Sequence, residues 1–293
     1  MRKRLAFTMM EMIFVIVILG IVVGGTFIQI SGVYESMMQK QYSSELQTEA
    51  KVVVEQVTSR LSSSIKDSLV AMTGTTGAGC VPVSGTLAAN TEYILAWVGR
   101  SDEANIGLWD TNDYKPGWSG FVDIKDSSLT AISTKGSKLG DAETIINQIA
   151  NITNSLSTNP NSPAAIYFAG SGTNTNACND FFTQTGKMYQ VTRAGDTQLN
   201  IIGVNIPTEI SEQYALSHSA YAIARDGTDL YLYSFRPWLS ENPDHANAKK
   251  YLLAKNVTGF GFKWEGGLFR VNICVGRTLN GFPIEVCKEK AVF

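Results

Sequence analysis

Residues 7–30 read FTMMEMIFVIVILGIVVGGTFIQI, and Glu11 is the only charged residue among these 24. As an α-helix, such a segment would extend about 36 Å, which exceeds the roughly 30 Å hydrocarbon core of a bilayer. A basic cluster at residues 2–4 precedes the segment, and the next charge after it is Glu35. The positive-inside rule therefore predicts one membrane-spanning helix with its N-terminus in the cytoplasm and the rest of the chain outside.

Two simpler kinds of segment share part of this pattern. A cleaved secretory signal peptide has an apolar stretch of about 7 to 15 residues and a cleavage site of the A-x-A type. Here the apolar run is longer, no such site ends it, and helical periodicity continues downstream. An uncleaved signal anchor would not need Glu11, because an acidic side chain in the membrane costs about 2.5 to 3.5 kcal/mol on insertion scales. A buried carboxylate of this kind indicates a partner and a function.

Residues 6–21, AFTMMEMIFVIVILGI, resemble the class III signal of type IV pilins and type II secretion pseudopilins. The shared pattern is a short basic leader, a small residue, Phe-Thr, two apolar residues, a glutamate and an unbroken apolar helix. The resemblance implies that a prepilin peptidase cuts between Ala6 and Phe7 and methylates the new amine. It also implies that Glu11 pairs with the N-terminal amine of a neighbouring subunit. Physical chemistry supports this pairing, since opposite charges attract far more strongly in a low dielectric than in water.

Two positions depart from the usual family pattern. Ala6 stands where glycine is usual, and Ile28 stands where many major pilins have a helix-kinking proline. The second departure weakens the case for a major filament subunit. Gly20 and Gly24 form a small-xxx-small pair, which either allows close helix approach or is an ordinary feature of membrane helices.

The helical pattern continues beyond the membrane segment. Apolar residues recur at spacings of three and four, which marks one face of an amphipathic helix, at Leu46, Ala50, Val53, Val54, Val57, Leu61, Ile65 and Leu69. With no proline in residues 7–72, we expect one long helix; a break near Gly24, Gly25 or Gly32 is the alternative. The expected organisation is a leader at 1–6, a membrane and assembly helix at 7–30, an amphipathic helix at 31–72 and an exported domain at 73–293.

The exported part is predicted to be an α+β domain whose sheet is mostly antiparallel. Residues 73–91 are predicted to be a loop, and Asp141 is predicted to cap a helix in which Ile145, Ile149, Ile152 and Leu156 share one face. Short strands are predicted at 93–98, 105–109, 121–124, 164–168 and 199–206. Hairpins are predicted at 221–225 with 230–235, and at 260–264 with 268–275, because glycine-containing turns separate the members of each pair.

The sequence holds four cysteines without zinc-type spacing: Cys80, Cys178, Cys274 and Cys287. An even number favours two disulfides and an oxidising compartment such as the periplasm. Asn280-Gly281 is a strong two-residue hairpin signal, which sets Leu279 opposite Phe282 and, counting outward, Cys274 opposite Cys287. That non-hydrogen-bonded pair has a Cα separation of roughly 4.5 Å, within disulfide range. Cys80 is then left to pair with Cys178.

No residue pattern points to catalysis or to a cofactor. The two histidines, His218 and His245, have no evident serine or carboxylate partner, and glycine-rich phosphate loops are missing from the sequence. Residues 110–113 contain Asp110, Asn112 and Asp113 but lack the other ligands of an EF-hand, which favours a solvated turn over a calcium site. We therefore expect no enzyme activity, no metal and no cofactor.

Two further features bear on partners. A net charge of −2 gives no reason to expect nucleic acid, and Lys249-Lys250 is only a scattered basic pair. The second feature is an aromatic-rich set, for which we favour packing in the core over docking of a partner or a carbohydrate. Its members are Tyr231, Tyr233, Phe235, Trp238, Phe260, Phe262 and Trp264.

The resemblance therefore implies a structural subunit of the bacterial inner membrane, with its C-terminal domain in the periplasm or in a filament. The large domain favours a minor pseudopilin or minor pilin at the filament tip, and the general layout looks like a J-type minor pseudopilin. Implied partners are the prepilin peptidase, other pilin or pseudopilin subunits, and the inner-membrane assembly platform. The alternative is a binding module, either an adhesin or a DNA-uptake pilin, on the same anchor. A periplasmic enzyme on a signal anchor has no support from the residues.

Overall fold

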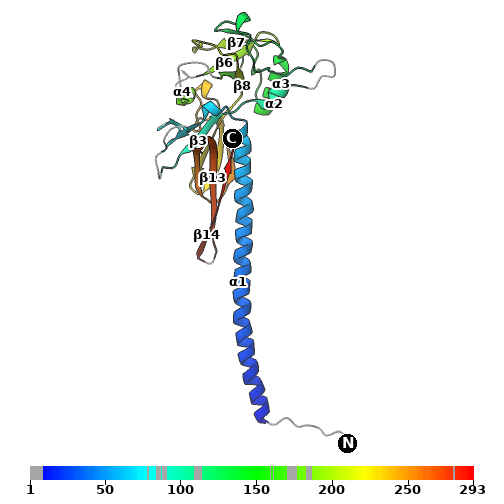
Figure 1. Ribbon diagram of the computed structural model, residues 1–293, viewed down its shortest axis with the longest axis vertical. Coiled ribbons are helices and arrows are strands. Elements are labelled where there is room, and N and C mark those ends of the chain that lie inside the picture. Colours follow the sequence, from blue (N-terminus) through cyan, green and yellow to red (C-terminus); the bar gives the residue numbers. More distant parts are fainter. Residues whose placement is uncertain are drawn as a thin grey trace.

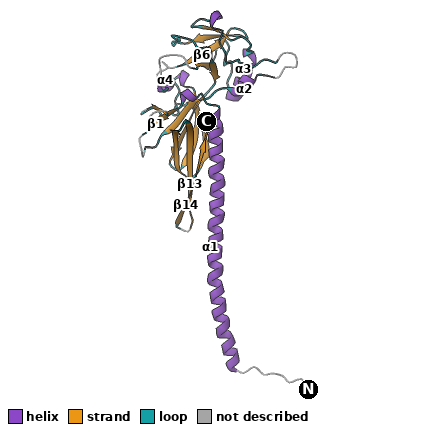
Figure 2. Ribbon diagram, viewed as in Figure 1, coloured by secondary structure: helices purple, strands orange, loops and turns teal. Residues whose placement is uncertain are grey.

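The computed structural model describes residues 9–77, 79–83, 87, 91–108, 114–158, 160, 162–169, 177–182, 187–279 and 281–293. Its dominant element is α1 (Met9–Ser62), a helix of 54 residues. Figure 1 shows that the N-terminal half of α1 projects away from the domain, while the C-terminal half lies along it. The fold is α+β, as predicted, with a long helix followed by antiparallel sheets (Figure 2).

The C-terminal half of α1 is buried along one face. The residues buried there recur at spacings of three and four: Leu46, Ala50, Val53, Val54, Val57 and Leu61. They pack against β13 and β14 and against buried residues of the central sheet, which include Leu95, Trp97 and Ile223. Burying a Val or Leu side chain contributes about 1.5 to 3 kcal/mol, so this face holds the helix firmly to the domain.

A six-stranded sheet of order β11-β10-β9-β3-β1-β2 forms the centre of the domain. Its strands are β1 (Val70–Met72), β2 (Val81–Pro82), β3 (Ile94–Val98), β9 (Ala220–Asp226), β10 (Asp229–Phe235) and β11 (Lys249–Ala254). In β3, Leu95 and Trp97 face the α1 core, while Ala96 and Val98 face a second core. Burial of both faces explains why this strand is a continuous apolar run rather than an alternating one.

The C-terminal sheet has three antiparallel strands, β12 (Val257–Glu265), β13 (Leu268–Leu279) and β14 (Phe282–Ala291). The pairing of β13 with β14 follows the predicted register, with Leu279 opposite Phe282 and Cys274 opposite Cys287. Its inner face buries Val271, Ile273 and Val275, as the alternation predicts. In Figure 1 this hairpin runs beside α1 toward the helix's N-terminal half.

A five-stranded antiparallel sheet of order β4-β7-β6-β5-β8 lies at the end of the molecule opposite the free half of α1 (Figure 1). Its strands are β4 (Ala131–Ser133), β5 (Ala164–Phe168), β6 (Met188–Arg193), β7 (Gln198–Ile202) and β8 (Tyr214–Ser217). Two helices, α2 (Asp102–Ile106) and α3 (Leu139–Ala150), contribute Ala104, Leu139 and Ile146 to its core. The remaining short helices are η1 (Lys66–Ser68), η2 (Ile124–Asp126), α4 (Cys178–Phe182) and η3 (Pro237–Leu239).

The predicted end of the long helix at residue 72 is wrong, because α1 ends at Ser62. Beyond it, the amide of Ile65 donates to the carbonyl of Val98 at 2.9 Å, and the amide of Val98 donates to Ser68 Oγ at 2.8 Å. The chain then pairs with β3 as strand β1. Pairing with a strand distant in sequence overrides the local helical spacing of Ile65 and Leu69.

Several predicted strand boundaries are also corrected. Where a strand was predicted at 105–109, residues 105–106 belong to α2, 107–108 form no strand, and residue 109 lies outside the described residues. The acidic first turn of α2, Asp102 and Glu103, suits a helix N-terminus. The predicted strand at 121–124 reduces to one bridge and the turn η2, where the Asp123 side chain accepts a hydrogen bond from the Lys125 amide. The strand predicted at 199–206 ends at Ile202, before a glycine with φ of +92°. The predicted loop at 73–91 contains the short strand β2.

The predicted face of the internal helix is wrong as well. Helix α3 starts at Leu139 with Lys138 at the N-cap, so Asp141 lies in its first turn rather than capping it. It buries Leu139, Ala142, Glu143 and Ile146, whereas Ile149 is 48% exposed. The helix ends at Ala150 because Asn151 adopts the left-handed conformation, which leaves Ile152 and Leu156 beyond it.

Candidate functional site

The N-terminal half of α1 is the candidate assembly surface. It is long and apolar enough to span a membrane, since an 18-residue window has a mean hydropathy of 2.7 and none of that window is buried. Thr26, a polar residue in this half, donates its hydroxyl to the carbonyls of Val22 and Val23, each at 3.0 Å. The hydroxyl is thereby satisfied within the helix, as a lipid environment requires.

Glu11 lies exposed in the first described turn of α1. Among the described residues, no hydrogen bond or ion pair involves its carboxylate. The predicted cleavage site, Ala6 and Phe7, lies outside the described residues. A side chain added at Gly20 or Gly24 would meet nothing within 4 Å, so this surface of the helix is open in the isolated chain.

The open apolar surface continues past the predicted membrane segment. A shallow groove of about 490 Å³ lies along the helix between Thr26 and Met37. Within it Tyr34 is 66% exposed, whereas burial against the domain begins only at Leu46. Helix α1 therefore presents an unpartnered apolar face through at least seven turns, estimated from about 3.6 residues per turn.

Salt bridges join the C-terminal hairpin to the middle of α1. The Arg277 guanidinium lies 2.9 Å from Glu49 Oε2 and 3.4 Å from Glu45 Oε1. Arg277 lies two residues after Val275 in β13, so both side chains point to the same face of the sheet, and Arg277 follows the last buried apolar residue of that face. The sequence analysis did not predict this contact, because its partners are more than 200 residues apart. The available signal was that Arg277 shares a face of its strand with the apolar residues Ile273 and Val275.

Both predicted disulfides occur in the structure. Cys80 pairs with Cys178, which joins the segment before β2 to α4 across a sequence separation of 98. Cys274 pairs with Cys287 across β13 and β14, with a Cα separation of 3.9 Å. The first bond ties together distant parts of the domain, whereas the second braces one hairpin.

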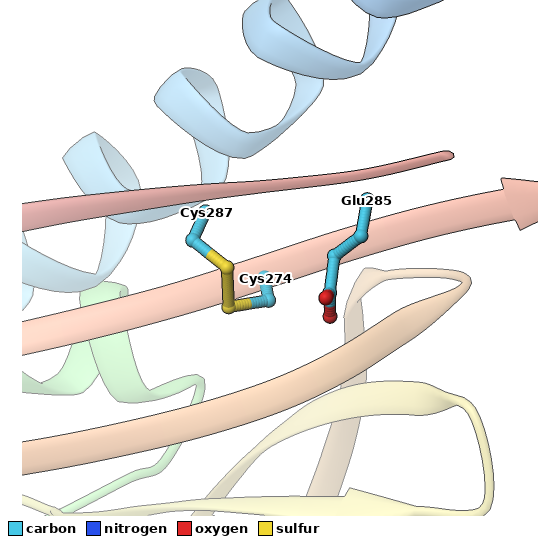
Figure 3. Close-up of side chains that lie close together, drawn as sticks. All are labelled: Cys274, Glu285 and Cys287. Carbon is cyan, nitrogen blue, oxygen red and sulfur yellow. A yellow bond between two sulfur atoms is a disulfide. The ribbon is translucent and has the colours of Figure 1, made fainter. Parts of the chain in front are cut away.

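A cluster of potential metal ligands in the described chain consists of Cys274, Glu285 and Cys287. Figure 3 shows the two sulfur atoms joined to each other beside the Glu285 carboxylate. Thiolates are the form of cysteine that binds metals, and neither sulfur is a thiolate here. Glu285 also accepts a hydrogen bond from the Thr258 hydroxyl. The predicted turn residues Asp110, Asn112 and Asp113 lie outside the described residues.

His218 is 8% exposed and lies between β8 and β9. Its Nδ1 is 3.1 Å from Ser101 Oγ, and its described hydrogen bonds include no carboxylate that could complete a catalytic triad. Burial lowers the pKa of the imidazole below its ordinary value, partly opposed by the charge of Glu103. The described contacts of His218 are therefore those of a buried histidine that is hydrogen-bonded to a serine. They do not match those of a general base that activates a catalytic nucleophile.

We expect His218 to make the domain less stable in mild acid. Its pKa is lowered in the folded chain, so the unfolded chain binds this proton more readily, and the free energy of unfolding falls as pH drops below about 6.5. Denaturation of the wild type and of His218→Gln at pH 7.5 and pH 5 measures this effect. The variant should lose less stability between the two pH values, whereas the exposed control His245→Gln should follow the wild type. Equal losses in all three proteins would contradict the prediction.

The aromatic-rich set mainly serves packing. Tyr233, Phe235 and Trp238 are buried in the second core, and the Trp238 indole donates to the Pro163 carbonyl at 2.8 Å. Trp264 is 41% exposed, and its ring centroid lies 6.0 Å from that of Phe269. Core and sheet packing therefore account for most of these residues.

The basic pair at the start of β11 is engaged in local contacts. Lys250 pairs with Asp226 at 3.0 Å and lies 3.9 Å from the Tyr231 ring centroid, while Lys249 Nζ donates to the Ala150 carbonyl at 3.1 Å.

No family model, curated protein or solved structure matches this chain. The features that bear on function are therefore α1, the N-terminal sequence pattern and the geometry of the domain.

Proposed function

We propose that this chain is a pilin-like subunit, which uses α1 to assemble with other subunits at a membrane. The observation that carries the proposal is the division of α1 into two halves. The C-terminal half is buried against the domain from Leu46 onward, whereas the N-terminal half is apolar, exposed and long enough to span a bilayer. A helix built in this way anchors the domain and leaves a long surface for neighbouring subunits.

The position of Glu11 supports assembly over simple anchoring. A lone carboxylate in an apolar span is costly unless it meets an opposite charge. The N-terminal ammonium created by cleavage before Phe7 is such a charge, and a neighbouring subunit shifted along the filament axis would bring it to Glu11. Pairing in a low-dielectric bundle offsets the desolvation of both groups.

The more specific proposal is a minor pseudopilin of a type II secretion system, or a minor pilin, at the filament tip. The described part of the domain contains three sheets beyond α1, which makes it bulky for close lateral packing along a filament. Two disulfides suit an oxidising compartment, so we place the domain in the periplasm and the N-terminus in the cytoplasm. The proposed partners are the prepilin peptidase, other pilin or pseudopilin subunits, and the inner-membrane assembly platform.

The mature protein is expected to begin at Phe7 with a methylated amine. The leader MRKRLA ends on a small residue before the Phe-Thr-x-x-Glu pattern, which is the arrangement that the prepilin peptidase is expected to cut. Intact-mass measurement of protein extracted from membranes, with and without active prepilin peptidase, tests this expectation. Retention of Met1 in cells with the active enzyme would contradict the proposal. An Ala6→Gly control should be cut at least as completely as the wild type.

A further inference from the structure

A cleft of about 600 Å³ lies where the end of α1, the end of α3 and the strands β9, β10 and β11 meet. This volume lies within the range of about 300 to 1,000 Å³ that is usual for small-molecule sites. Neither the assembly surface on α1 nor the two disulfides contribute to it. The cleft is therefore a separate feature of the exported domain.

The charge in the cleft is unbalanced. Three cations line it, Arg60, Arg236 and Lys249, but the one carboxylate of the lining, Glu241, is already engaged with Arg236 at 2.8 Å. Arg60 is exposed and has no salt bridge among the described residues. Two cations therefore remain uncompensated in the cleft of a chain whose net charge is −2, which favours an anionic ligand.

A buried polar side chain also faces this cleft. His218 lines it and is 8% exposed, and its Nδ1 is engaged with the buried hydroxyl of Ser101. The Nε2 edge of the ring is thus the edge that a ligand in the cleft can reach, and no hydrogen bond at Nε2 occurs among the described contacts. Nε2 is not among the fully buried polar atoms that lack a partner in the described chain, so it reaches the open space of the cleft and is available to a ligand there.

The remaining lining suits a polyhydroxylated ligand. The hydroxyls of Ser219, immediately before β9, and Ser234, in β10, lie 2.6 Å apart, and Asn247 adds an exposed amide group. Tyr221 and Tyr251 provide aromatic surface, with Tyr251 49% exposed. A phosphate or halide ion would use the two cations but would leave the aromatic groups without a contact. The combined lining therefore favours a larger anion that also carries hydroxyl groups.

We propose that this cleft binds a carboxylate-bearing sugar, with Arg60 and Lys249 recognising the carboxylate. The hydroxyl groups and His218 Nε2 would bond to the sugar hydroxyls, and an exposed tyrosine face would cover the ring. Lys249 is already positioned by its hydrogen bond to the last carbonyl of α3, Ala150, at 3.1 Å. This binding role does not depend on the proposed assembly function, because it concerns the domain and not the N-terminal half of α1.

The test is ligand-observed NMR titration of the full chain in detergent micelles with sodium glucuronate. We expect a Kd of about 1 mM, the ordinary strength for a ligand of monosaccharide size. Glucose has the same hydroxyls without the carboxylate, and we expect it to bind about tenfold more weakly because the charge-assisted bonds are lost. Arg60→Gln and Lys249→Gln should each weaken glucuronate binding by about tenfold.

The matched control is Lys51→Gln, which removes an exposed cation from the same helix as Arg60 but outside the cleft. It should leave the glucuronate Kd unchanged. Equal binding of glucose and glucuronate, or no effect of Arg60→Gln, would overturn the proposal. Binding of N-acetylglutamate amide as tightly as glucuronate would also overturn it, because the cleft would then recognise an acidic peptide rather than a sugar. Failure of N-terminal processing would leave these binding results unchanged, so the two proposals fail separately.

Discussion

Glu11→Gln is expected to insert into the membrane at least as well as the wild type but to lose at least about 100-fold in incorporation into the filament. Removing one partner from a buried ion pair costs about 3 to 5 kcal/mol, because the other charge is left without compensation. Glutamine keeps the size and polarity of the side chain and removes only its charge. Insertion itself should improve, since a carboxylate in an apolar span costs about 2.5 to 3.5 kcal/mol.

Membrane fractionation measures insertion, and quantification of the subunit in sheared filaments or in cross-linked assemblies measures incorporation. Glu35→Gln is the matched control, because it removes the next acidic residue of the same helix, beyond the predicted membrane segment. This control should assemble as the wild type does. Normal incorporation of Glu11→Gln would show that Glu11 is not an assembly contact, and equal loss in both variants would point to a general effect of charge on α1.

Removing the Cys80–Cys178 disulfide is expected to have the largest effect on stability. Its sequence separation is 98, whereas that of Cys274–Cys287 is 13. Chain-entropy estimates give about 4.7 kcal/mol for a loop of about 100 residues and about 3 kcal/mol for one of about 15 residues. Because Cys178 is buried, replacement by alanine avoids leaving a buried hydroxyl without a partner.

Denaturation of full chains in micelles, followed by the fluorescence of the buried Trp97 and Trp118, compares three proteins. These are the wild type, Cys80→Ala with Cys178→Ala, and Cys274→Ala with Cys287→Ala. The first double variant should lose about 1.7 kcal/mol more than the second on the chain-entropy scale. A larger loss from the hairpin pair would contradict the entropic account and would indicate that the hairpin bond stabilises the folded state directly.

Several features of this protein follow from the sequence because they depend on local patterns. The length of the apolar run from residue 7 determines that α1 can span a membrane, and the isolated charge singles out Glu11. The period of three and four correctly predicts the buried face from Leu46 to Leu61. The Asn280-Gly281 dipeptide in the sequence predicts the register of the last hairpin, in which Cys274 lies opposite Cys287. In each case, neighbours within a few residues carry the information.

Other features were decided only by tertiary structure. Helix α1 ends at Ser62 because the following segment bonds to Val98 and joins β3, although its apolar spacing continues to suit a helix. Arg277 meets Glu45 and Glu49 only after the C-terminal hairpin packs along α1. The cleft forms from the ends of α1 and α3 and from three strands, so no local pattern contains it. Contacts between distant segments compete with local preference, and the burial and hydrogen bonds that they provide determine which conformation is adopted.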